Sequence, residues 1–344
     1  MKQRFGLYLA VTVVSLLIAS PDAAAKPGTV DCDRNGSLAK ALESSVGSAE
    51  TLVINLVGTC YESVTINRDR VRIIGDGNTA IVGRIRVFGS DNVQFDSLAI
   101  TGTDHGLTIR NSRVRLIDVR ITGNEGDGIE LAESATIQMN GGEVSNNAGT
   151  GVSLTGSYAR LSDTQVTGNA GSGIGANSAS TVQIYGGVVS NNDGHGIDMM
   201  FNSALSLWDT EISSNGRTEG YGVHFGFGSS GEIHFATITA NSGEGVEAFS
   251  NSTVHINGGQ IYGNDHHGVS LGLRSVGDLT DVQIYGNVGQ GAALWAGSGL
   301  FVSGASNIPP NNAGWSVQCD GKESSVQVHA PAAVPAIDCT DPEF

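Results

Sequence analysis

Short runs in which apolar and polar residues alternate recur along most of this chain, and each run ends at glycine or asparagine. In Val182-Gln-Ile184 and Ile197-Asp-Met199 every second residue is apolar, which is the period of a β-strand. Gly-Gly, Asn-Asn and Asn-x-Gly follow such runs, and these residues accept positive φ or bond their own backbone. The chain can therefore turn sharply and begin another strand, and the pattern predicts three short strands per repeat.

The same frame returns at a nearly constant interval: an apolar residue, Ser or Thr, any residue, Asn, any residue, Gly, any residue, Gly, then alternating apolar positions. Its Asn stands at 124, 147, 169, 192, 215, 241, 264 and 287, in steps of 23, 22, 23, 23, 26, 23 and 23 residues. Units of this length bury their apolar faces only by stacking. We predict a solenoid whose coils pair in parallel about 4.8 Å apart with right-handed crossovers. The repeated Asn should form a ladder that bonds buried turn backbone.

The repeat from about Asn92 to Ser298 resembles the right-handed parallel β-helix of the pectin-lyase-like superfamily, a group of carbohydrate-binding and sugar-cleaving solenoids. The stretch from Leu52 to Ile66 is similar to the first coil of such proteins. The resemblance implies an all-β fold, a single-stranded right-handed parallel β-helix. It does not identify an activity, because one fold carries many functions.

The N-terminal residues have the features of a secretory signal peptide over residues 1–25. Lys2 and Arg4 precede an apolar run, and Ala23-Ala-Ala25 is a small-residue cleavage site. No other run is long and apolar enough for a transmembrane helix. We therefore expect a secreted or periplasmic protein with no membrane insertion.

The two ends of the solenoid are expected to be capped. Residues 26–50 form the N-terminal cap with a short helix over 35–47, which Asn35 or Ser37 can cap and which places Leu38, Leu42 and Val46 on one face. The β-helix should extend over residues 51–308. Pro309-Pro310 and a Pro/Ala-rich stretch break the repeat, so residues 309–344 are expected to form an irregular C-terminal cap.

Export gives the four cysteines a structural meaning, since disulfides persist in oxidising compartments. Four cysteines allow three pairings. We favour Cys32 with Cys60 and Cys319 with Cys339, because the intervening solenoid would hold the two pairs far apart. No close Cys or His spacing suits zinc, so no metal site is predicted.

The net charge of −16 limits the partners. An acidic exported protein is a poor partner for nucleic acid. It also repels anionic polysaccharides unless a basic groove or Ca²⁺ intervenes, which makes Ca²⁺ a possible cofactor. A polysaccharide or other glycan is the partner that the resemblance implies, and the oligomeric state is left open.

Aligning the repeats produces two columns of residues that we expect to be exposed. The first, between the two glycines of the frame, reads Asp127, Thr150, Ser172, His195, Tyr221, Glu244, His267 and Gln290. The second, two positions after the second glycine, reads Glu130, Ser153, Gly175, Asp198, His224, Glu247, Ser270 and Ala293. Titratable and aromatic side chains gather in the same four coils, so a single functional strip is predicted.

This strip supplies the candidate catalytic residues His195, Asp198, Tyr221, His224, Glu244 and Glu247. The candidate substrate-binding residues are His267, Phe249, Trp295 and, from an insertion in the repeat, Arg217. A lyase or epimerase acting on a uronic-acid chain needs a base and an acid, and His and Tyr serve well. We expect His195 or His224 to act with Tyr221, while Glu244 sets a His tautomer.

Two other functions are compatible with the strip. Asp198 and Glu247 would be two coils apart, about 10 Å, which suits an inverting glycoside hydrolase. A non-catalytic, adhesive solenoid could use the strip to bind glycans. Gly194-His195-Gly196 resembles an element of polygalacturonases, which would place His195 in an active site, but the other motifs of that family are missing. The concentration of titratable residues in four coils favours an enzyme acting on polysaccharide.

Overall fold

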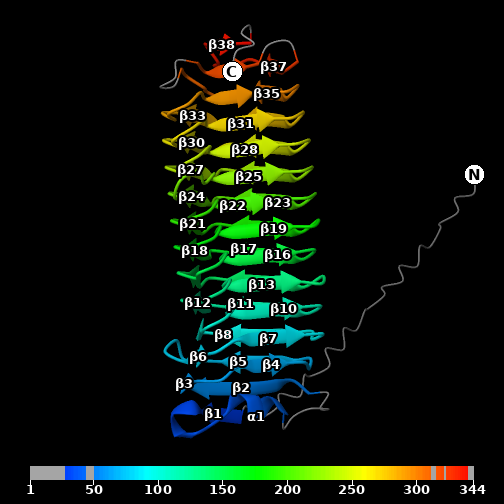
Figure 1. Cartoon of the computed structure of the whole chain (residues 1–344), viewed down its shortest axis with the longest axis vertical. Coiled ribbons are helices and arrows are strands. Elements are labelled where there is room, and N and C mark those ends of the chain that lie inside the picture. Colours follow the sequence, from blue (N-terminus) through cyan, green and yellow to red (C-terminus); the bar gives the residue numbers. More distant parts are fainter. Residues whose placement is uncertain (1–27, 44–49, 311–314, 321–322, 340–344) are drawn as a thin grey trace, which may run out of the picture.

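The computed structural model describes residues 28–43, 50–310, 315–320 and 323–339. These residues form a right-handed parallel β-solenoid, as the repeat predicts, in which each coil contributes one strand to each of three sheets (Figure 1). We call the sheets A, B and C, with 14, 11 and 13 strands respectively. Every strand pair is parallel, as expected for successive coils of one solenoid.

Sheet A consists of β1 (Gly28–Asp31), β2 (Leu52–Val57), β5 (Val71–Ile74), β8 (Val93–Asp96), β11 (Arg113–Ile117), β14 (Thr136–Asn140), β17 (Tyr158–Ser162), β20 (Thr181–Tyr185), β23 (Ala204–Trp208), β26 (Ser230–His234), β29 (Thr253–Asn257), β32 (Val276–Thr280), β35 (Gly299–Ser303) and β37 (Ser325–Val328). Sheet B consists of β3 (Thr59–Cys60), β6 (Ala80–Val82), β9 (Ala99–Thr101), β12 (Arg120–Thr122), β15 (Glu143–Ser145), β18 (Gln165–Thr167), β21 (Val188–Ser190), β24 (Glu211–Ser213), β27 (Thr237–Thr239), β30 (Gln260–Tyr262) and β33 (Gln283–Tyr285). Sheet C consists of β4 (Val64–Ile66), β7 (Ile85–Phe88), β10 (Leu107–Arg110), β13 (Ile129–Ala132), β16 (Val152–Thr155), β19 (Ile174–Asn177), β22 (Ile197–Met199), β25 (Val223–Gly226), β28 (Val246–Phe249), β31 (Val269–Gly272), β34 (Ala292–Leu294), β36 (Val317–Cys319) and β38 (Ile337–Asp338).

The interior is a continuous column of apolar side chains from all three sheets. Residues alternate between inward and outward positions along each strand, so Ile197 and Met199 of β22 are fully buried while Asp198 between them faces outward. The same alternation places Val223 and Phe225 of β25 in the core and His224 outside. Sequence alternation thus decides which residues can form a surface site.

The repeated asparagines form the predicted ladder at the turn between sheets B and C. Each side-chain amide from Asn124 to Asn264 donates to the side-chain oxygen of the next asparagine, as Asn169 does to Asn192 at 2.9 Å and Asn192 to Asn215 at 2.9 Å. The same amide groups also donate to backbone carbonyls of an earlier coil, such as Val166 for Asn192. These side chains are almost completely buried, so the ladder satisfies turn backbone that water cannot reach.

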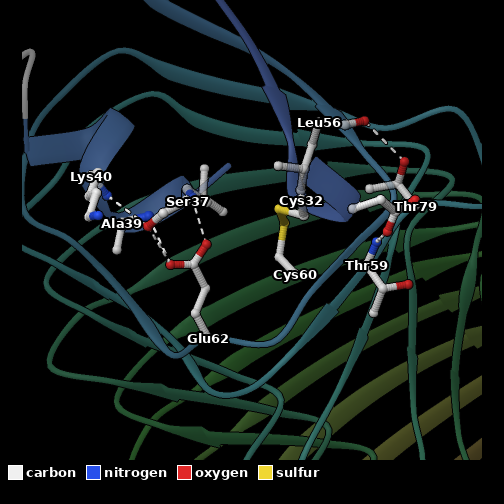
Figure 2. The surroundings of a disulfide bond; sticks show 11 residues. Cys32, Ser37, Ala39, Lys40, Leu56, Thr59, Cys60, Glu62 and Thr79 are labelled. Carbon is white, nitrogen blue, oxygen red and sulfur yellow. Dashed lines mark hydrogen bonds between the residues drawn. A yellow bond between two sulfur atoms is a disulfide. The ribbon is translucent and has the colours of Figure 1, made fainter. Parts of the chain in front are cut away.

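The N-terminal end is closed by α1 (Leu38–Glu43) and a 3₁₀ turn (Cys32–Arg34). The helix was expected from residue 35 and begins at Leu38, and its cap is Ser37, one of the two predicted, whose hydroxyl accepts the amide hydrogen of Lys40. The Glu62 carboxylate accepts hydrogens from the Ser37 hydroxyl and from the amides of Leu38 and Ala39 (Figure 2). Leu38 and Leu42 are buried as predicted. Residues 35–37 of the expected helix precede α1 and are not helical, and residues 44–47 lie outside the described residues.

Both predicted disulfides are present, one at each end of the solenoid. Cys32 bonds to Cys60 beside α1 (Figure 2), and Cys319 bonds to Cys339 between β36 and the segment after β38. The C-terminal residues were expected to form an irregular cap, yet among the described ones β36 and β38 extend sheet C and β37 extends sheet A. The expected signal peptide lies outside the described residues, within which no helix is long and apolar enough to cross a membrane.

Candidate functional site

The strip predicted from the sequence is a real surface on sheet C and the turn that precedes it. The first column is in register because the amides of the framing glycines bond the carbonyls of the next coil: Gly173 to His195, Gly196 to Tyr221 and Gly222 to Glu244, each at 2.9 Å. The second column is set by strand pairing, in which Asp198 is opposite His224 and His224 opposite Glu247. Six titratable side chains from three coils therefore lie together.

The centre of the strip is His224 on β25. Its Nδ1 lies 2.9 Å from Asp198 Oδ1, and its Nε2 lies 3.4 Å from Glu247 Oε2. The His224 side chain is only 14% exposed and that of Glu247 only 11%. The imidazole thus occupies the space between two carboxyl groups from the coils before and after it, largely shielded from water.

The carboxylates differ from the sequence prediction in two respects. Asp198 orients His224, whereas Glu244, which we expected to set a tautomer, lies 3.7 Å from Nδ1 of His266. Glu244 and Glu247 were expected to be exposed, and both residues are buried with 8% exposure. The reason is local, because side chains of neighbouring coils only one strand spacing away cover them.

Two further rings contact this centre from the first column. His195 and Tyr221 are stacked, with ring centroids 4.8 Å apart and planes inclined by 19°. The centroid of His224 lies 5.4 Å from that of His195 and 5.5 Å from that of Tyr221. Residues at 195, 221 and 224 therefore form one three-ring cluster over β22 and β25.

The backbone fixes the tautomer of His195. Its Nδ1 accepts the amide hydrogen of Tyr221 at 3.1 Å, so a neutral ring carries its proton on Nε2. Burial lowers the pKa of His195, with the charge of Asp198 opposing this shift and that of His224 adding to it. A neutral His195 is a hydrogen-bond donor through Nε2 and not a base through that atom.

Burial also controls the acids of the cluster. It raises the pKa of Glu247 to about 7, while the charge of His224 and a hydrogen bond from Tyr221 act in the opposite direction. Burial raises the pKa of Tyr221 well above its usual range, and the charges of Glu247, Glu244 and Glu219 add to the effect. Tyr221 therefore keeps its proton at neutral pH, whereas Glu247 can exchange one there.

A third outward column borders the strip with apolar side chains. Met200, Phe249 and Trp295 alternate with Gly226 and Gly272, and a Cβ at Gly226 would lie 2.7 Å from Met200 Sδ. A Cβ at Gly272 would lie 3.0 Å from the Phe249 ring and would also meet the Trp295 indole. The glycines are therefore needed for these large side chains to lie across the neighbouring coils, and Phe249 and Trp295 form a wall beside the acids.

Two of the predicted binding residues lie at the margins. Arg217 is 80% exposed on the inserted turn, and its Nη1 lies 3.3 Å from Asp193 Oδ2. His267 accepts the amide hydrogen of Gln290 at Nδ1, and burial lowers its pKa to about 4. The sequence reasoning missed His266, the partner of Glu244, and Glu219, whose place in the same insertion as Arg217 was its only signal.

Donor atoms of His195, Asp198 and His224 lie within 4.8 Å of one another, which raises the question of a metal. Ca²⁺ prefers six to eight oxygen ligands, and this set offers two imidazoles and one carboxylate. The Nε2 proton of neutral His195 also opposes coordination by that atom. The cluster therefore does not fit Ca²⁺, and its groups are better suited to proton transfer.

The sequence model of the family described as "Right handed beta helix region" matches residues 60–215 and 150–307. No curated protein matches the chain significantly.

Among solved structures, the A-module of the mannuronan C-5 epimerase AlgE6 of Azotobacter vinelandii has a TM-score of 0.59 and 14% identity, covering 90% of this chain and 97% of that chain. The pectate lyase Pel9A has a TM-score of 0.51 and 13% identity, covering 91% and 78%. The full-length tailspike protein 2 of an Escherichia coli O157:H7 bacteriophage has a TM-score of 0.50 and 11% identity, covering 88% and 46%. The structural similarity shows a shared fold, and at identities this low it shows the fold alone.

Proposed function

We propose that this chain, which belongs to the right-handed β-helix family, is an exported enzyme that acts on a polysaccharide containing uronic acids, as a lyase or an epimerase. The observation that carries the proposal is the Asp198–His224–Glu247 row with Tyr221 and His195 beside it. Two of the solved structures that share the fold are named as a mannuronan C-5 epimerase and a pectate lyase, which supports the same substrate class. The disulfides are consistent with export to an oxidising compartment.

The proposed first step is removal of the proton from the carbon next to the substrate carboxylate. Asp198 accepts Nδ1–H of His224, which leaves the Nε2 lone pair of His224 to take the proton. Neutral His195 donates from Nε2 to the substrate carboxylate and stabilises the negative charge that develops there. Glu247, whose pKa is about 7, can then relay the proton from His224.

The second step distinguishes the two reactions. In a lyase, the electrons left on that carbon form a double bond to its neighbour, the glycosidic carbon–oxygen bond breaks, and the leaving oxygen takes a proton from Tyr221. In an epimerase, the same carbon takes a proton on its opposite face. Tyr221 holds its proton at neutral pH because its pKa is raised, and it would donate that proton in either reaction only to a stronger base, the developing alkoxide or carbanion.

The glycosidase alternative is disfavoured by the position of His224. An inverting pair of carboxyl groups needs space between them for the substrate and a water molecule. Here the imidazole of His224 lies between Asp198 and Glu247 and contacts both. A non-catalytic glycan-binding solenoid remains the second candidate, because the Phe249 and Trp295 wall would serve either role.

The decisive experiment is incubation of the secreted protein with a panel of polyuronates. Ultraviolet absorbance of unsaturated uronates reports a lyase, proton NMR of the uronate units reports an epimerase, and new reducing ends without absorbance report a hydrolase. Binding with silence in all three assays would establish the adhesive alternative and reject the enzyme.

Within an active preparation, Asp198→Asn should lower kcat by about 10²- to 10⁴-fold with a small change in KM, because His224 loses the group that holds its tautomer. Asp209→Asn is the matched control, since Asp209 is exposed on the turn that joins sheets A and B. If kcat were unchanged in both Asp198→Asn and His224→Gln, the strip would not be the active site.

A further inference from the structure

Sheet A carries a second cluster of aromatic and polar residues on a different face from the strip. Three outward rings lie at the same position of successive strands: Tyr185 on β20, Trp208 on β23 and His234 on β26. Trp208 and His234 are stacked with centroids 3.8 Å apart and planes inclined by 16°. The guanidinium carbon of Arg160 lies 4.6 Å from the centroid of Tyr185.

A hollow of about 370 Å³ lies beside these rings. Seven of its lining residues, on β20, β23, β26 and β29, are uncharged, and we call them its floor: Thr181, Ala204, Leu205, Ser206, Ser230, Gly231 and Thr253. Glu232 and His255 also line it, and because their side chains are 67% and 61% exposed we call them its rim. This volume falls within the roughly 300–1,000 Å³ of small-molecule sites.

Two contacts join the rings to the hollow. The indole Nε1 of Trp208 donates to Ser206 Oγ at 3.1 Å, which turns the indole toward the floor. Glu232 Oε2 lies 3.9 Å from Nε2 of His234, so the rim carboxylate stands beside the stacked pair. The rings and the hollow are therefore one surface unit, formed by β20, β23 and β26.

We propose that this unit is a binding site for a neutral sugar chain. His234 covers one face of the Trp208 indole, so the C–H face of a pyranose would stack on the other face. Ser206, Ser230 and the exposed carboxylate of Glu232 offer hydroxyl and carboxylate partners for sugar hydroxyls.

The charge of the rim selects among sugars. Glu232 lies at the rim, and Asp278 lies beyond it with Oδ2 3.6 Å from Nδ1 of His255. The nearest guanidinium on the same column, Arg160, is two strands from Ser206 and packs on Tyr185. A uronate would therefore meet like charge, whereas an uncharged hexose chain would not.

This site does not depend on the function proposed for sheet C. Binding at sheet A would keep the protein on a mixed polysaccharide or a cell surface while the strip acts on another part of the polysaccharide. This attachment raises the effective concentration of substrate at the strip. Conversely, the site would operate unchanged if the strip only bound glycans.

The test is calorimetric titration of the whole protein with cellohexaose, mannohexaose and maltohexaose, and with a hexauronate as the charged comparison. We expect at least one neutral hexasaccharide to bind, Trp208→Ala to weaken it by about tenfold or more, and Glu232→Gln to weaken it less. Saturating hexauronate should leave the neutral affinity unchanged, because the strip lies on sheet C.

Trp315→Ala is the matched control, since Trp315 is exposed near the C-terminal end, and Trp208→Phe should keep most of the affinity and the fold. Absence of binding by all three neutral sugars at millimolar concentration would overturn the proposal. So would a Trp208→Ala variant that unfolds at the wild-type temperature and binds them as tightly as the wild type. Loss of neutral binding in His224→Gln would also overturn it, by placing the sugar on sheet C.

Discussion

Burial changes the protonation of two residues in the strip. Glu247 and His267 stand in the same strip, and burial moves both toward their neutral forms. For Glu247 this raises the pKa to about 7 from 4.5, and for His267 it lowers the pKa to about 4 from 6.5. The two residues consequently make opposite contributions to the pH dependence of stability.

The signs follow from proton binding. Between pH 4.5 and about 7 the folded protein holds a proton on Glu247 that the unfolded chain has released, so this residue makes stability fall as pH rises. Between about pH 4 and 6.5 the unfolded chain holds a proton on His267 that the folded protein lacks, so this residue makes stability rise with pH. Each effect is at most about 3 kcal/mol.

We therefore predict opposite trends for two single variants. Relative to the wild type, Glu247→Gln should gain stability as pH increases from 4.5 to 7, and His267→Gln should lose stability as pH increases from 4 to 6.5. Thermal unfolding of the three proteins across this range measures both differences. Parallel trends for the two variants would contradict the burial that we assign to these side chains.

Among the elements, the turn between sheets B and C depends most clearly on one residue type. Asn192 donates from Nδ2 to Val166 O and Asn215 Oδ1, and its own Oδ1 accepts from Asn169. Replacement by a residue without an amide removes this partner from buried groups of the coil before and the coil after Asn192. The sequence frame was sufficient to predict this ladder, because its spacing is constant.

Asn192→Ala should consequently lower the free energy of unfolding by about 2–5 kcal/mol, since each buried unsatisfied group costs about 1–3 kcal/mol. Asn257→Ala is the matched control, because Asn257 is exposed at the end of β29 and is not in the left-handed region. Urea denaturation measures both variants. A loss no larger than that of the control would mean that other groups or water satisfy the ladder.

A second ladder escaped the sequence analysis. At the turn between sheets C and A, the amide of Ser180 donates to the Ser203 hydroxyl, and that of Ser275 donates to the Ser298 hydroxyl. Serine recurs there at the interval of the asparagines, but it is common in exposed turns and carries no sign of burial.

The outward columns were predictable because alternation fixes which way a side chain points. The pairing of His224 with Asp198 was not, because it depends on side-chain rotation within the column.

Across the whole molecule, stability is local because each coil contacts mainly its two neighbours. The disulfide Cys32–Cys60 therefore secures the first coils and has no direct contact with the strip on β22 to β28. The same argument holds for Cys319–Cys339 at the other end.

Replacing Cys32 and Cys60 together by Ser should cost about 2–4 kcal/mol of local stability. Hydrogen exchange should accelerate in β1, β2 and β5 and change little in β25. The double replacement of Cys319 and Cys339 serves as the counterpart and should loosen β36 and β38. If hydrogen exchange accelerated equally in all coils of either variant, the solenoid would unfold as one cooperative unit and its stability would not be local.

The step from Asn215 to Asn241 is 26 residues, three longer than the usual 23, yet the ladder bond between the two asparagines is 3.0 Å. The extra residues lie in the turn that contains Arg217. At its base, the backbones of Gly216 and Gly220 pack against each other, so the loop closes before it can push the coils apart. Extra length is thus absorbed outside the cylinder wall. A longer loop at this position, beside the rings of His195 and Tyr221, would change which ligands reach those rings. The coils beneath the loop would keep their structure.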